Sequence, residues 1–335
     1  MAISNSVTRL LGIKHPIVLA PMDLVAHARL ALAVSQAGGF GFLGAGYGDA
    51  AWLERELANL SQTNAQLQQQ QPFGVGFITW SLLRQPHLLD LALAANPRAV
   101  LLSFGDPEPF VRRIKDAGAL LVCQVQHVGM AIDVVAKGAD IVVAQGGEAG
   151  GHGVSQGSFT LVPAVVDAIG DEVPVLLAGG AVDGRGLAAA IMLGAQGIVM
   201  GTRFYASVEA AGHEAAKQRI VAASGDQTLR SIVFDISRNN VWPHPFTGRC
   251  LANRHTQQWL GRELELMRRE DVIAEFAGAC QTGNFDIAPV IAGEAVALVR
   301  DIRSANEIVW RTVAEAERLL AGGSHCITKE NSTAA

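Results

Sequence analysis

The fold of this chain is decided by the stretch PVLLAGGAVDGRGLAAAIMLGAQGIVMGTRF, residues 174–204. It contains two short apolar runs, each ending in glycine, with a segment of helical periodicity between them. The glycines fall in AGG at 178–180 and in MGT at 200–202. In (β/α)8 barrels, the loops after the seventh and eighth strands commonly bind a phosphate group. The stretch therefore predicts the last two β/α units of such a barrel.

The same pattern of an apolar run, a polar turn and a helical segment recurs toward the N-terminus. Runs that are continuously apolar are typical of parallel strands buried on both faces. The eight predicted strands lie at 17–22, 40–45, 73–78, 99–104, 120–125, 140–145, 174–179 and 197–202. The predicted helices include 24–37, 52–60, 107–117, 129–137 and 185–193. This alternation predicts an α/β fold, a closed (β/α)8 TIM barrel.

An open, doubly wound sheet is the main alternative to the barrel. Such a sheet binds its dinucleotide at a glycine fingerprint after the first strand. The first predicted strand instead ends in Ala20, Pro21 and Met22, without a glycine cluster. The segment GAGYG at 44–48 follows the second strand, but it lacks the last glycine of GxGxxG. We therefore interpret it as a turn near the barrel mouth.

Composition excludes several other classes of protein. The chain has 335 residues, of which 50% are hydrophobic and 17% charged, and its net charge is −5. A disordered chain and a protein with a wide basic surface for nucleic acid are both disfavoured. No apolar run approaches the ~20 residues needed to cross a bilayer, and the N-terminus lacks the apolar segment of a signal peptide. These features predict a cytoplasmic protein without nucleic-acid or membrane partners, and they give no indication of its oligomeric state.

The regular pattern ends after residue 203, which suggests three regions. We expect the barrel in residues 1–210 and a mostly helical subdomain flanking its mouth in residues 211–275. Within the subdomain we expect helices at 213–224 and 256–268, a strand at 231–236 (SIVFDI), and a loop at 239–249. Residues 276–335 should supply C-terminal helices that pack back on the barrel. Two helices are expected between 286 and 321, one of them at 306–320.

The loop after the sixth predicted strand carries the strongest candidate for chemistry. AQGGEAGGHGVSQGS, residues 144–158, places six glycines around Glu148 and His152. Glycines allow backbone N–H groups to approach a ligand closely, and an imidazole titrates near neutral pH. His152 is therefore the predicted catalytic residue, and the alternative is a glycine-rich turn with a solvated histidine. No HxH or HExxH spacing surrounds it, so no metal site is predicted.

Other histidines are weaker candidates. His127 follows the fifth predicted strand without a glycine-rich loop, and we interpret it as structural, at the edge of the site. His244 and His255 lie in the expected subdomain and could border a substrate channel. Packing or surface roles are expected for His15, His27, His87, His213 and His325.

Without a metal, the site would take its reactivity from an organic cofactor. One phosphate clamp suits FMN or PLP, but PLP needs a Schiff-base lysine, and no lysine lies at a predicted strand end. FMN needs an apolar wall, amide contacts to the pyrimidine edge of its ring, and the phosphate clamp. Gln124, one of the predicted amide contacts, could alternatively be a polar residue of the barrel interior with no role in cofactor binding. The predicted cofactor-binding residues are Ala20, Pro21, Met22, Gly74, Gly76, Gln124, Gln145, Gly146, Gly150, Gly151, Gly179, Gly180, Gly201 and Thr202.

Several of these motifs together resemble the nitronate monooxygenases, formerly called 2-nitropropane dioxygenases. The resemblance rests on APM in the first strand, AQGGEAGGHG, residues 176–204 and GRCLANR at 248–254, and it spans residues 8–255. It implies an FMN enzyme that oxidises alkyl nitronates with O2 to a carbonyl compound and nitrite, with neutral nitroalkanes as the alternative substrate. It also implies that His152 is either the base or the group that binds the nitronate.

Two alternatives to this activity stay open. Related glycine-rich loops occur in flavin-dependent enoyl reductases and in NADH:quinone reductases, so an NAD(P)H-dependent FMN reductase of quinones or enoyl thioesters is the main alternative. Some members, including quinone-reducing ones, have Asn in the turn of strand three and Lys at the end of strand five. This chain has Gly74-Val75-Gly76 and Gln124 at those places, which disfavours quinone reduction. A non-catalytic barrel that binds a phosphorylated ligand is the second alternative.

Overall fold

The core of the molecule is a closed barrel of parallel strands. The computed structural model describes residues 3–240 and 242–322. Eight parallel strands are ordered β1-β9-β8-β6-β5-β4-β3-β2, and a bridge between Val18 and Phe40 joins β1 to β2. The predicted barrel is confirmed, because every strand lies within one of the predicted apolar runs. The strands are β1 (Ile17–Leu19), β2 (Gly41–Gly44), β3 (Phe73–Ile78), β4 (Ala99–Ser103), β5 (Leu120–Val125), β6 (Ile141–Gln145), β8 (Val175–Ala178) and β9 (Ile198–Met200).

Two hydrophobic layers explain why these strands are apolar throughout. Phe42 and Leu176 belong to the cluster that fills the barrel interior, whereas the next residues, Leu43 and Leu177, belong to the cluster between strands and helices. Successive side chains of a strand point to opposite faces, so a sheet covered on both faces needs apolar residues at every position. The short helix α1 (Ser6–Leu11) adds its buried side chains to the interior cluster.

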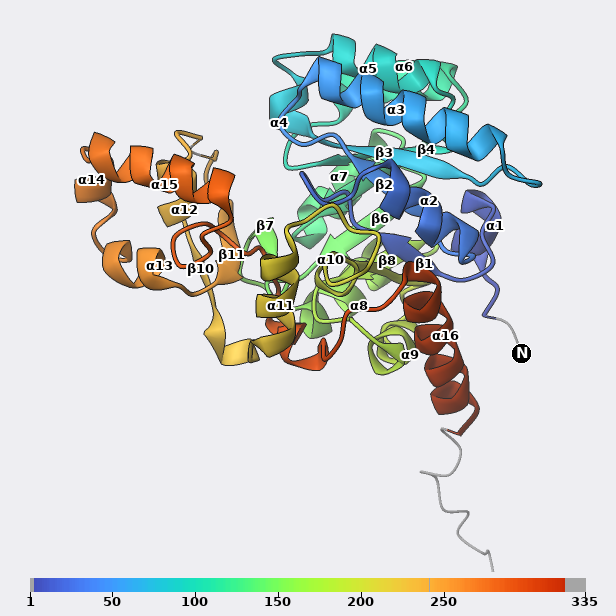
Figure 1. The fold of residues 1–335 in the computed structure, drawn as a ribbon. Helices are drawn as coiled ribbons and strands as arrows, with labels where there is room; N and C mark the ends of the chain where they lie inside the picture. Colours follow the sequence, from blue (N-terminus) through green and yellow to red (C-terminus); the bar gives the residue numbers. More distant parts are fainter. Residues whose placement is uncertain (1–2, 241, 323–335) are drawn as a thin grey trace, which may run out of the picture.

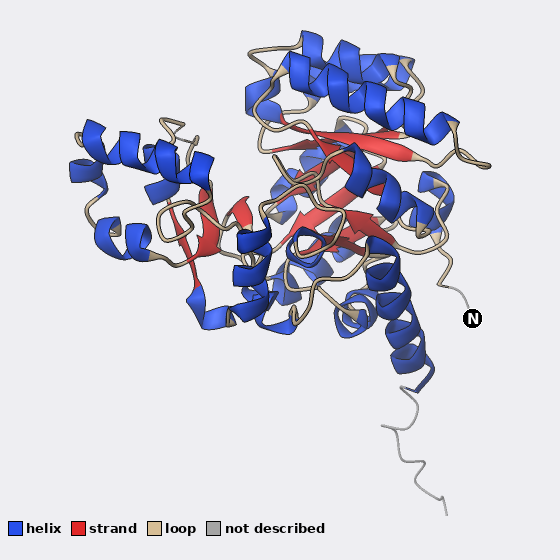
Figure 2. Ribbon diagram, in the orientation of Figure 1, coloured by secondary structure: helices blue, strands red, loops and turns tan. Residues whose placement is uncertain are grey.

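Helices surround the barrel (Figures 1 and 2). The ring is completed by α16 (Ala305–Gly322), which packs against α9 and α2 although it lies far from both in the sequence. This helix contains the predicted helix at 306–320. The others are α2 (Ala28–Gln36), α3 (Ala50–Ala65), α4 (Thr79–Leu82), α5 (His87–Ala94), α6 (Glu108–Asp116), α7 (Val128–Ala136), α8 (Ser158–Ile169) and α9 (Gly184–Met192).

The chain between β9 and α16 forms a second layer beside the barrel, and its residues 228–282 lie on the left of Figure 1. Its strands β10 (Thr228–Ser231) and β11 (Thr247–Leu251) form an antiparallel sheet with β7 (Gly151–Gly153), which belongs to the loop after β6. The domain limits at 210 and 275 stay predictions. The helical elements of this part are α10 (Thr202–Tyr205), α11 (Glu214–Ala222), η1 (Gly225–Gln227), α12 (Val233–Ser237), α13 (Arg254–Trp259), α14 (Glu263–Leu266), α15 (Glu270–Thr282) and η2 (Glu294–Leu298).

The predicted strand at 231–236 is wrong, because most of this segment is the helix α12. Val233 and Ile236 both pack into a cluster with Trp259 and Leu266. Two apolar residues three positions apart lie on one face of a helix, so the tertiary contact selects helix over strand. The strand of this region, β10, ends where the predicted one begins.

Three other details of this region also differ from expectation. The expected loop at 239–249 ends in β11, which pairs with β7 and β10. The helix expected at 256–268 is divided into α13 and α14, and Gly261 between them has a φ of 80°, outside the helical range. Only the 3-10 turn η2 precedes α16 where a first C-terminal helix was expected.

No helix in the described part of the chain is both long enough and apolar enough to cross a bilayer.

Candidate active site

The glycine-rich loop after β6 is held by hydrogen bonds from its own side chains and from two arginines. Both carboxylate oxygens of Glu148 accept from the Ser158 N–H at 2.9 Å, and one also accepts from its hydroxyl. Arg230 donates to the carbonyls of Gly147 and Ala149, and Arg249 donates to that of Gly147. Because this loop has few side chains to pack, these bonds to its carbonyl groups set its conformation.

The loop positions His152 on β7, a strand that the sequence did not predict. His152 lies opposite Gly248 in the antiparallel pairing of β7 with β11. Gln145, at the end of β6, donates a hydrogen bond of 3.0 Å to the carbonyl oxygen of His152. The backbone of this histidine is therefore fixed from both sides.

The imidazole of His152 is held between a carboxylate and an indole. Its Nε2 atom lies 3.0 Å from both Oδ1 and Oδ2 of Asp235, and both side chains are buried. The ring stacks on Trp242, with centroids 3.4 Å apart and an angle of 5° between the planes. Trp242 in turn donates from Nε1 to the hydroxyl of Tyr47 at 2.9 Å. Asp235 lies on α12 and Trp242 on the segment after it, so both come from the second layer.

The surroundings of His152 favour its neutral form. Burial lowers the pKa of the imidazole below its usual value near 6.5, and the positive charges of Arg238 and Arg230 act in the same direction. The Asp235 carboxylate opposes this shift without cancelling it. A neutral imidazole has one nitrogen free to accept a proton, which is what a general base requires.

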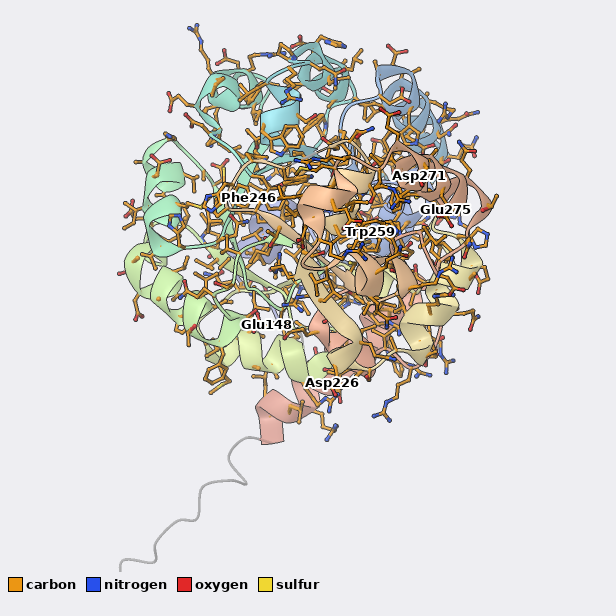
Figure 3. The ribbon with its side chains drawn as sticks, turned by 90° about the vertical axis from the view of Figure 1, so that its left-hand side faces the viewer. Glu148, Asp226, Phe246, Trp259, Asp271 and Glu275 are labelled. Atoms are coloured by element: carbon orange, nitrogen blue, oxygen red, sulfur yellow. The ribbon has the colours of Figure 1, made fainter. Side chains whose placement is uncertain are left out.

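Aromatic rings gather around Trp242 at the carboxyl ends of the strands. Trp80 and Phe104, which follow β3 and β4, lie 5.4 and 4.9 Å from Trp242 between centroids. Tyr47, after β2, and Phe246, from the second layer, complete the group. In Figure 3 the layer that carries Trp259 and Asp271 lies in front of the barrel, with Phe246 beside it. The wall of the site near His152 is therefore apolar and aromatic.

Three glutamines form a chain of hydrogen bonds at the ends of β5 and β6. The Nε2 atoms of Gln124 and Gln126 donate to Oε1 of Gln145 at 3.2 and 3.0 Å. Gln145 uses its own Nε2 for the carbonyl of His152, so both ends of its amide are occupied. The Oε1 atom of Gln126 is buried and has no donor among the residues that the structure describes. Gln126, which was not predicted, therefore offers an acceptor beside Gln124.

The loops after β8 and β9 retain the features expected of a phosphate clamp. Gly179 and Gly180 have φ values of 98° and 78°, and a Cβ atom added to Gly180 would meet nothing within 4 Å. Helix α10 begins at Thr202, so its first N–H groups have no partner within the helix. The Thr202 hydroxyl oxygen accepts from the N–H of Gly293 at 3.0 Å, which leaves its own proton free to donate. Gly293 was not predicted to lie here.

The structure brings the remaining predicted wall residues together. Gly76 lies against Pro21, because an added Cβ would approach the Pro21 side chain to 2.3 Å. Gly201 faces Met22 and Ala20, at 3.5 and 3.7 Å from such a Cβ. The assignment of these residues, and of Gly74, Gly146, Gly150 and Gly151, to cofactor binding stays a prediction.

The other histidines have local roles in the structure. His127 is the N-cap of α7, where its Nδ1 accepts from the Met130 N–H. His255 is buried and its Nε2 lies 2.8 Å from the Ser237 hydroxyl. His244 is exposed, and His325 lies outside the described residues. Among the described residues, no group of three or more His, Cys, Asp or Glu side chains could hold a metal ion.

Sequence reasoning singled out His152 as a candidate but not Asp235 or Trp242, which the structure places against it. The glycine-rich loop indicated the histidine by composition alone, whereas its partners lie 83 and 90 residues further along the chain. Asp235 was placed in a predicted strand and Trp242 in a predicted loop. The usable signal was the phrase NNVWPHPFTGR at 239–249, which concentrates aromatic side chains in a chain with only 6% aromatics.

Fold and site together define an α/β-barrel enzyme with a buried histidine–aspartate pair at the carboxyl ends of its strands. A family model described as nitronate monooxygenase matches residues 4–83 and 83–315. A nitronate monooxygenase of Neurospora crassa is 33% identical over 91% of this chain and 90% of its own length. The chain belongs to the nitronate monooxygenase family and is an oxidoreductase, which confirms the resemblance described above.

Two solved structures share the fold over almost the whole chain. FabK from Thermotoga maritima has a TM-score of 0.84 and 30% identity, covering 97% of this chain and 99% of its own. A nitroalkane oxidase from Streptomyces ansochromogenes has a TM-score of 0.78 and 25% identity, covering 96% and 100%. The second layer therefore belongs to a shared architecture, and it is not an addition peculiar to this chain.

Proposed function

We propose that the protein is an FMN-dependent monooxygenase that oxidises small alkyl nitronates with O2 to a carbonyl compound and nitrite. The observation that carries the proposal is the His152–Asp235 pair, since His152 belongs to the loop after β6, and that loop also contacts Gly179 after β8. Family membership supports the reaction class. We also propose that the chain between β9 and α16, including residues 211–275, covers this site.

The residues at the barrel mouth fit FMN. Gly179, Gly180, Gly201 and Thr202 would hold its phosphate, since Gly180 faces open space and the Thr202 hydroxyl has a free proton. Gln124 and the Oε1 acceptor of Gln126, which is free among the described residues, would meet the polar edge of its ring. Ala20, Pro21 and Met22, with Gly74 and Gly76, would form the apolar wall. When bound, FMN would supply the redox chemistry by taking electrons from the nitronate and passing them to O2.

His152 would act as the base when the substrate is a neutral nitroalkane. The imidazole is kept neutral by burial, so it can accept the α-proton of the substrate. The imidazolium that forms would be stabilised by Asp235 at 3.0 Å. A preformed nitronate needs no base, and for that substrate the same side chain would hold the anion by a hydrogen bond.

The test is anaerobic mixing of the flavin-loaded protein with propyl-2-nitronate and, separately, with NADH and NADPH, following flavin absorbance. We expect rapid bleaching by the nitronate, and nitrite release when O2 is readmitted. Bleaching by NADH or NADPH with no response to the nitronate would overturn the proposal in favour of an FMN reductase of quinones or enoyl thioesters. Protein that stays colourless with added FMN would indicate a non-catalytic barrel.

The variant His152→Ala tests the role of the base. It should retain FMN but lose turnover of neutral nitroalkanes by about 100-fold or more, whereas turnover of preformed nitronate should fall much less. His87→Ala is the matched control, because His87 is exposed at the start of α5 and away from the site. Equal losses on both substrates would remove the base role and leave His152 as a binding group.

A further inference from the structure

We infer that Asp235 is the positioning residue of this site: it holds the proton of His152 on Nε2, so that Nδ1 is the nitrogen that accepts the substrate proton. The catalytic part of this inference rests on the proposed function. The geometric part concerns only residues that the structure describes.

The tautomer follows from the chemistry of the contact. An ionised carboxylate accepts hydrogen bonds and cannot donate them. Both oxygens of Asp235 lie 3.0 Å from Nε2, so that nitrogen must carry the hydrogen. In a neutral imidazole the proton then leaves Nδ1 with a free lone pair. Nδ1 has no hydrogen-bond partner among the described residues, and it is not one of their fully enclosed polar atoms.

The imidazole of His152 cannot easily turn over about its Cβ–Cγ bond. One face stacks on Trp242, and Gly248 lies against the ring, where an added Cβ would be 3.5 Å from Nε2. The backbone on which the ring turns is held by the β7–β11 pairing and by the bond from Gln145. A half-turn of the ring would place a carbon against Asp235 and leave a buried carboxylate without its partner, which is costly.

The charged groups around His152 come from several elements. Asp235 approaches from α12, Arg238 from the turn after α12, and Arg230 from β10. The positive charge of Arg238 also acts on Asp23 and Tyr47, which follow β1 and β2, and it favours their ionised forms. Among the groups that act on His152, Asp235 alone raises the pKa of the imidazole, while both arginines lower it. Removing the charge of Asp235 must therefore move the titration of His152 to lower pH.

A merely structural aspartate would give a different result. Asparagine has the same shape as aspartate, and it would preserve the packing of α12 against α13, α14 and α15. It would remove the negative charge. Its amide N–H could also donate to Nε2, which would favour the tautomer of His152 that carries the hydrogen on Nδ1. Asp235→Asn therefore separates the role of the charge from the role of the shape. In enzymes with a catalytic histidine–aspartate pair, replacing the aspartate with asparagine favours the wrong imidazole tautomer and severely lowers kcat.

The decisive experiment is 15N NMR of the flavin-loaded protein with 15N-labelled histidine, for the wild type and for Asp235→Asn. The wild type should show the hydrogen on Nε2, and the variant should titrate His152 at lower pH. Asp226→Asn is the control, since Asp226 is an exposed carboxylate of the second layer (Figure 3) and should leave both properties unchanged. A wild-type spectrum with the hydrogen on Nδ1 would overturn the inference without any variant.

Kinetics supply the second readout. Asp235→Asn should reduce kcat for a neutral nitroalkane by about 10- to 1000-fold and move the acidic, ascending limb of kcat/KM to lower pH. Preformed propyl-2-nitronate should be affected much less. An unshifted pH profile in a folded variant would reduce Asp235 to a structural residue. If the wild type turns over neither compound, the proposed function fails, while the NMR still decides the role of Asp235.

Discussion

The glycines of the site occupy two kinds of surroundings, one closely packed and one open. In the loop after β6, a Cβ added to Gly146 would lie 2.1 Å from the Ser158 hydroxyl oxygen, and one added to Gly150 would lie 2.7 Å from the backbone of Ala292. At Gly180, after β8, the same atom would meet nothing within 4 Å. Close packing therefore explains the first group without any ligand, whereas the open position of Gly180 is what a bound phosphate would use.

Gly150→Ala should lower the free energy of unfolding by about 1 to 3 kcal/mol. The new methyl group would overlap backbone atoms of Ala292 and Gly293, which cannot move aside as a flexible side chain could. Urea unfolding measures the change, provided that the slope with denaturant stays constant. Gly278→Ala is the control, because a Cβ there meets nothing and Gly278 lies within α15, so a gain of about 0.5 to 1 kcal/mol is expected. Equal stability of the two variants would contradict this explanation.

At the scale of elements, the sequence predicts the barrel strands and fails for the sheet that positions His152. Strands such as β5, LLVCQV, are predictable because burial on both faces requires a continuous apolar run. The strand β7 has the sequence Gly-His-Gly, which carries no β-branched or apolar signal, and it exists only because β11 pairs with it. Asp235 was misplaced for a related reason, since the contacts of α12 with α13 and α14 determine its conformation.

Arg230 makes a testable contribution to this sheet. It lies opposite Arg249 in the β10–β11 pairing and donates to the carbonyls of Gly147, Ala149 and Thr247. Arg230→Lys keeps a positive charge but loses the forked geometry that reaches several carbonyls together. We expect a loss of about 2 kcal/mol and faster amide hydrogen exchange in residues 147–151.

The control for this prediction is Arg262→Lys. Arg262 is half exposed and pairs with Glu265 on the surface, so its replacement should change stability by less than about 0.5 kcal/mol. Unchanged exchange in the loop of the Arg230→Lys variant would show that the β7–β11 pairing alone holds it.

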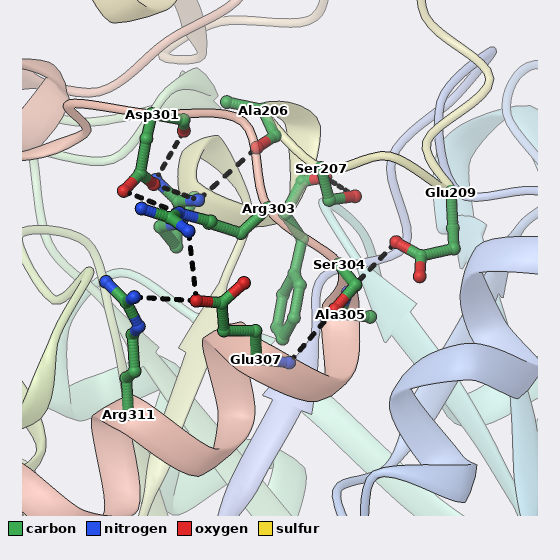
Figure 4. A network of polar contacts seen from close by, with 11 residues as sticks. Ala206, Ser207, Glu209, Asp301, Arg303, Ser304, Ala305, Glu307 and Arg311 are labelled. Carbon is green, nitrogen blue, oxygen red and sulfur yellow. Dashed lines mark hydrogen bonds and ion pairs between the residues drawn. The ribbon is translucent and has the colours of Figure 1, made fainter.

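At the scale of the whole molecule, the barrel depends on a contact between its eighth strand and its last helix. Arg203, just after β9, is buried and donates to the carbonyl and the carboxylate of Asp301. Arg303 pairs with Asp301 and with Glu307 of α16, and Arg311 pairs with the same Glu307 (Figure 4). The network holds α16 in the ring of helices, although the whole second layer separates α16 from β9 in the sequence.

Arg203→Leu should destabilise the protein by about 2 to 3 kcal/mol, because it removes charge-assisted bonds from a buried place and leaves a backbone carbonyl without its donor. Arg311→Leu is the matched control. Arg311 belongs to the edge of the same network and is half exposed, so its loss should cost less than about 1 kcal/mol. Thermal unfolding compares the two variants. Equal shifts in Tm would mean that the network acts as a surface cluster and does not join the two segments.

Several histidines titrate below their usual range in the folded protein. Burial is the largest cause in each case, because it disfavours the charged imidazolium. The second layer contributes His255, and the barrel and its loops contribute the rest. The residues with a lowered pKa are His15, His27, His152 and His255.

This set of histidines predicts that the protein loses stability as the pH falls from 7.5 to 5.5. Below an unfolded pKa near 6.5, the unfolded chain binds more protons than the folded one, so the free energy of unfolding rises with pH across this window. The carboxylates with lowered pKa values, such as Asp271 at about 2, titrate below it. Urea midpoints at several pH values measure the slope, and His255→Gln should reduce it, since one buried imidazole no longer charges on unfolding. A urea midpoint that stays constant or rises on acidification would contradict the buried, neutral state of these histidines. It would then also contradict the proposal that neutral His152 acts as the base.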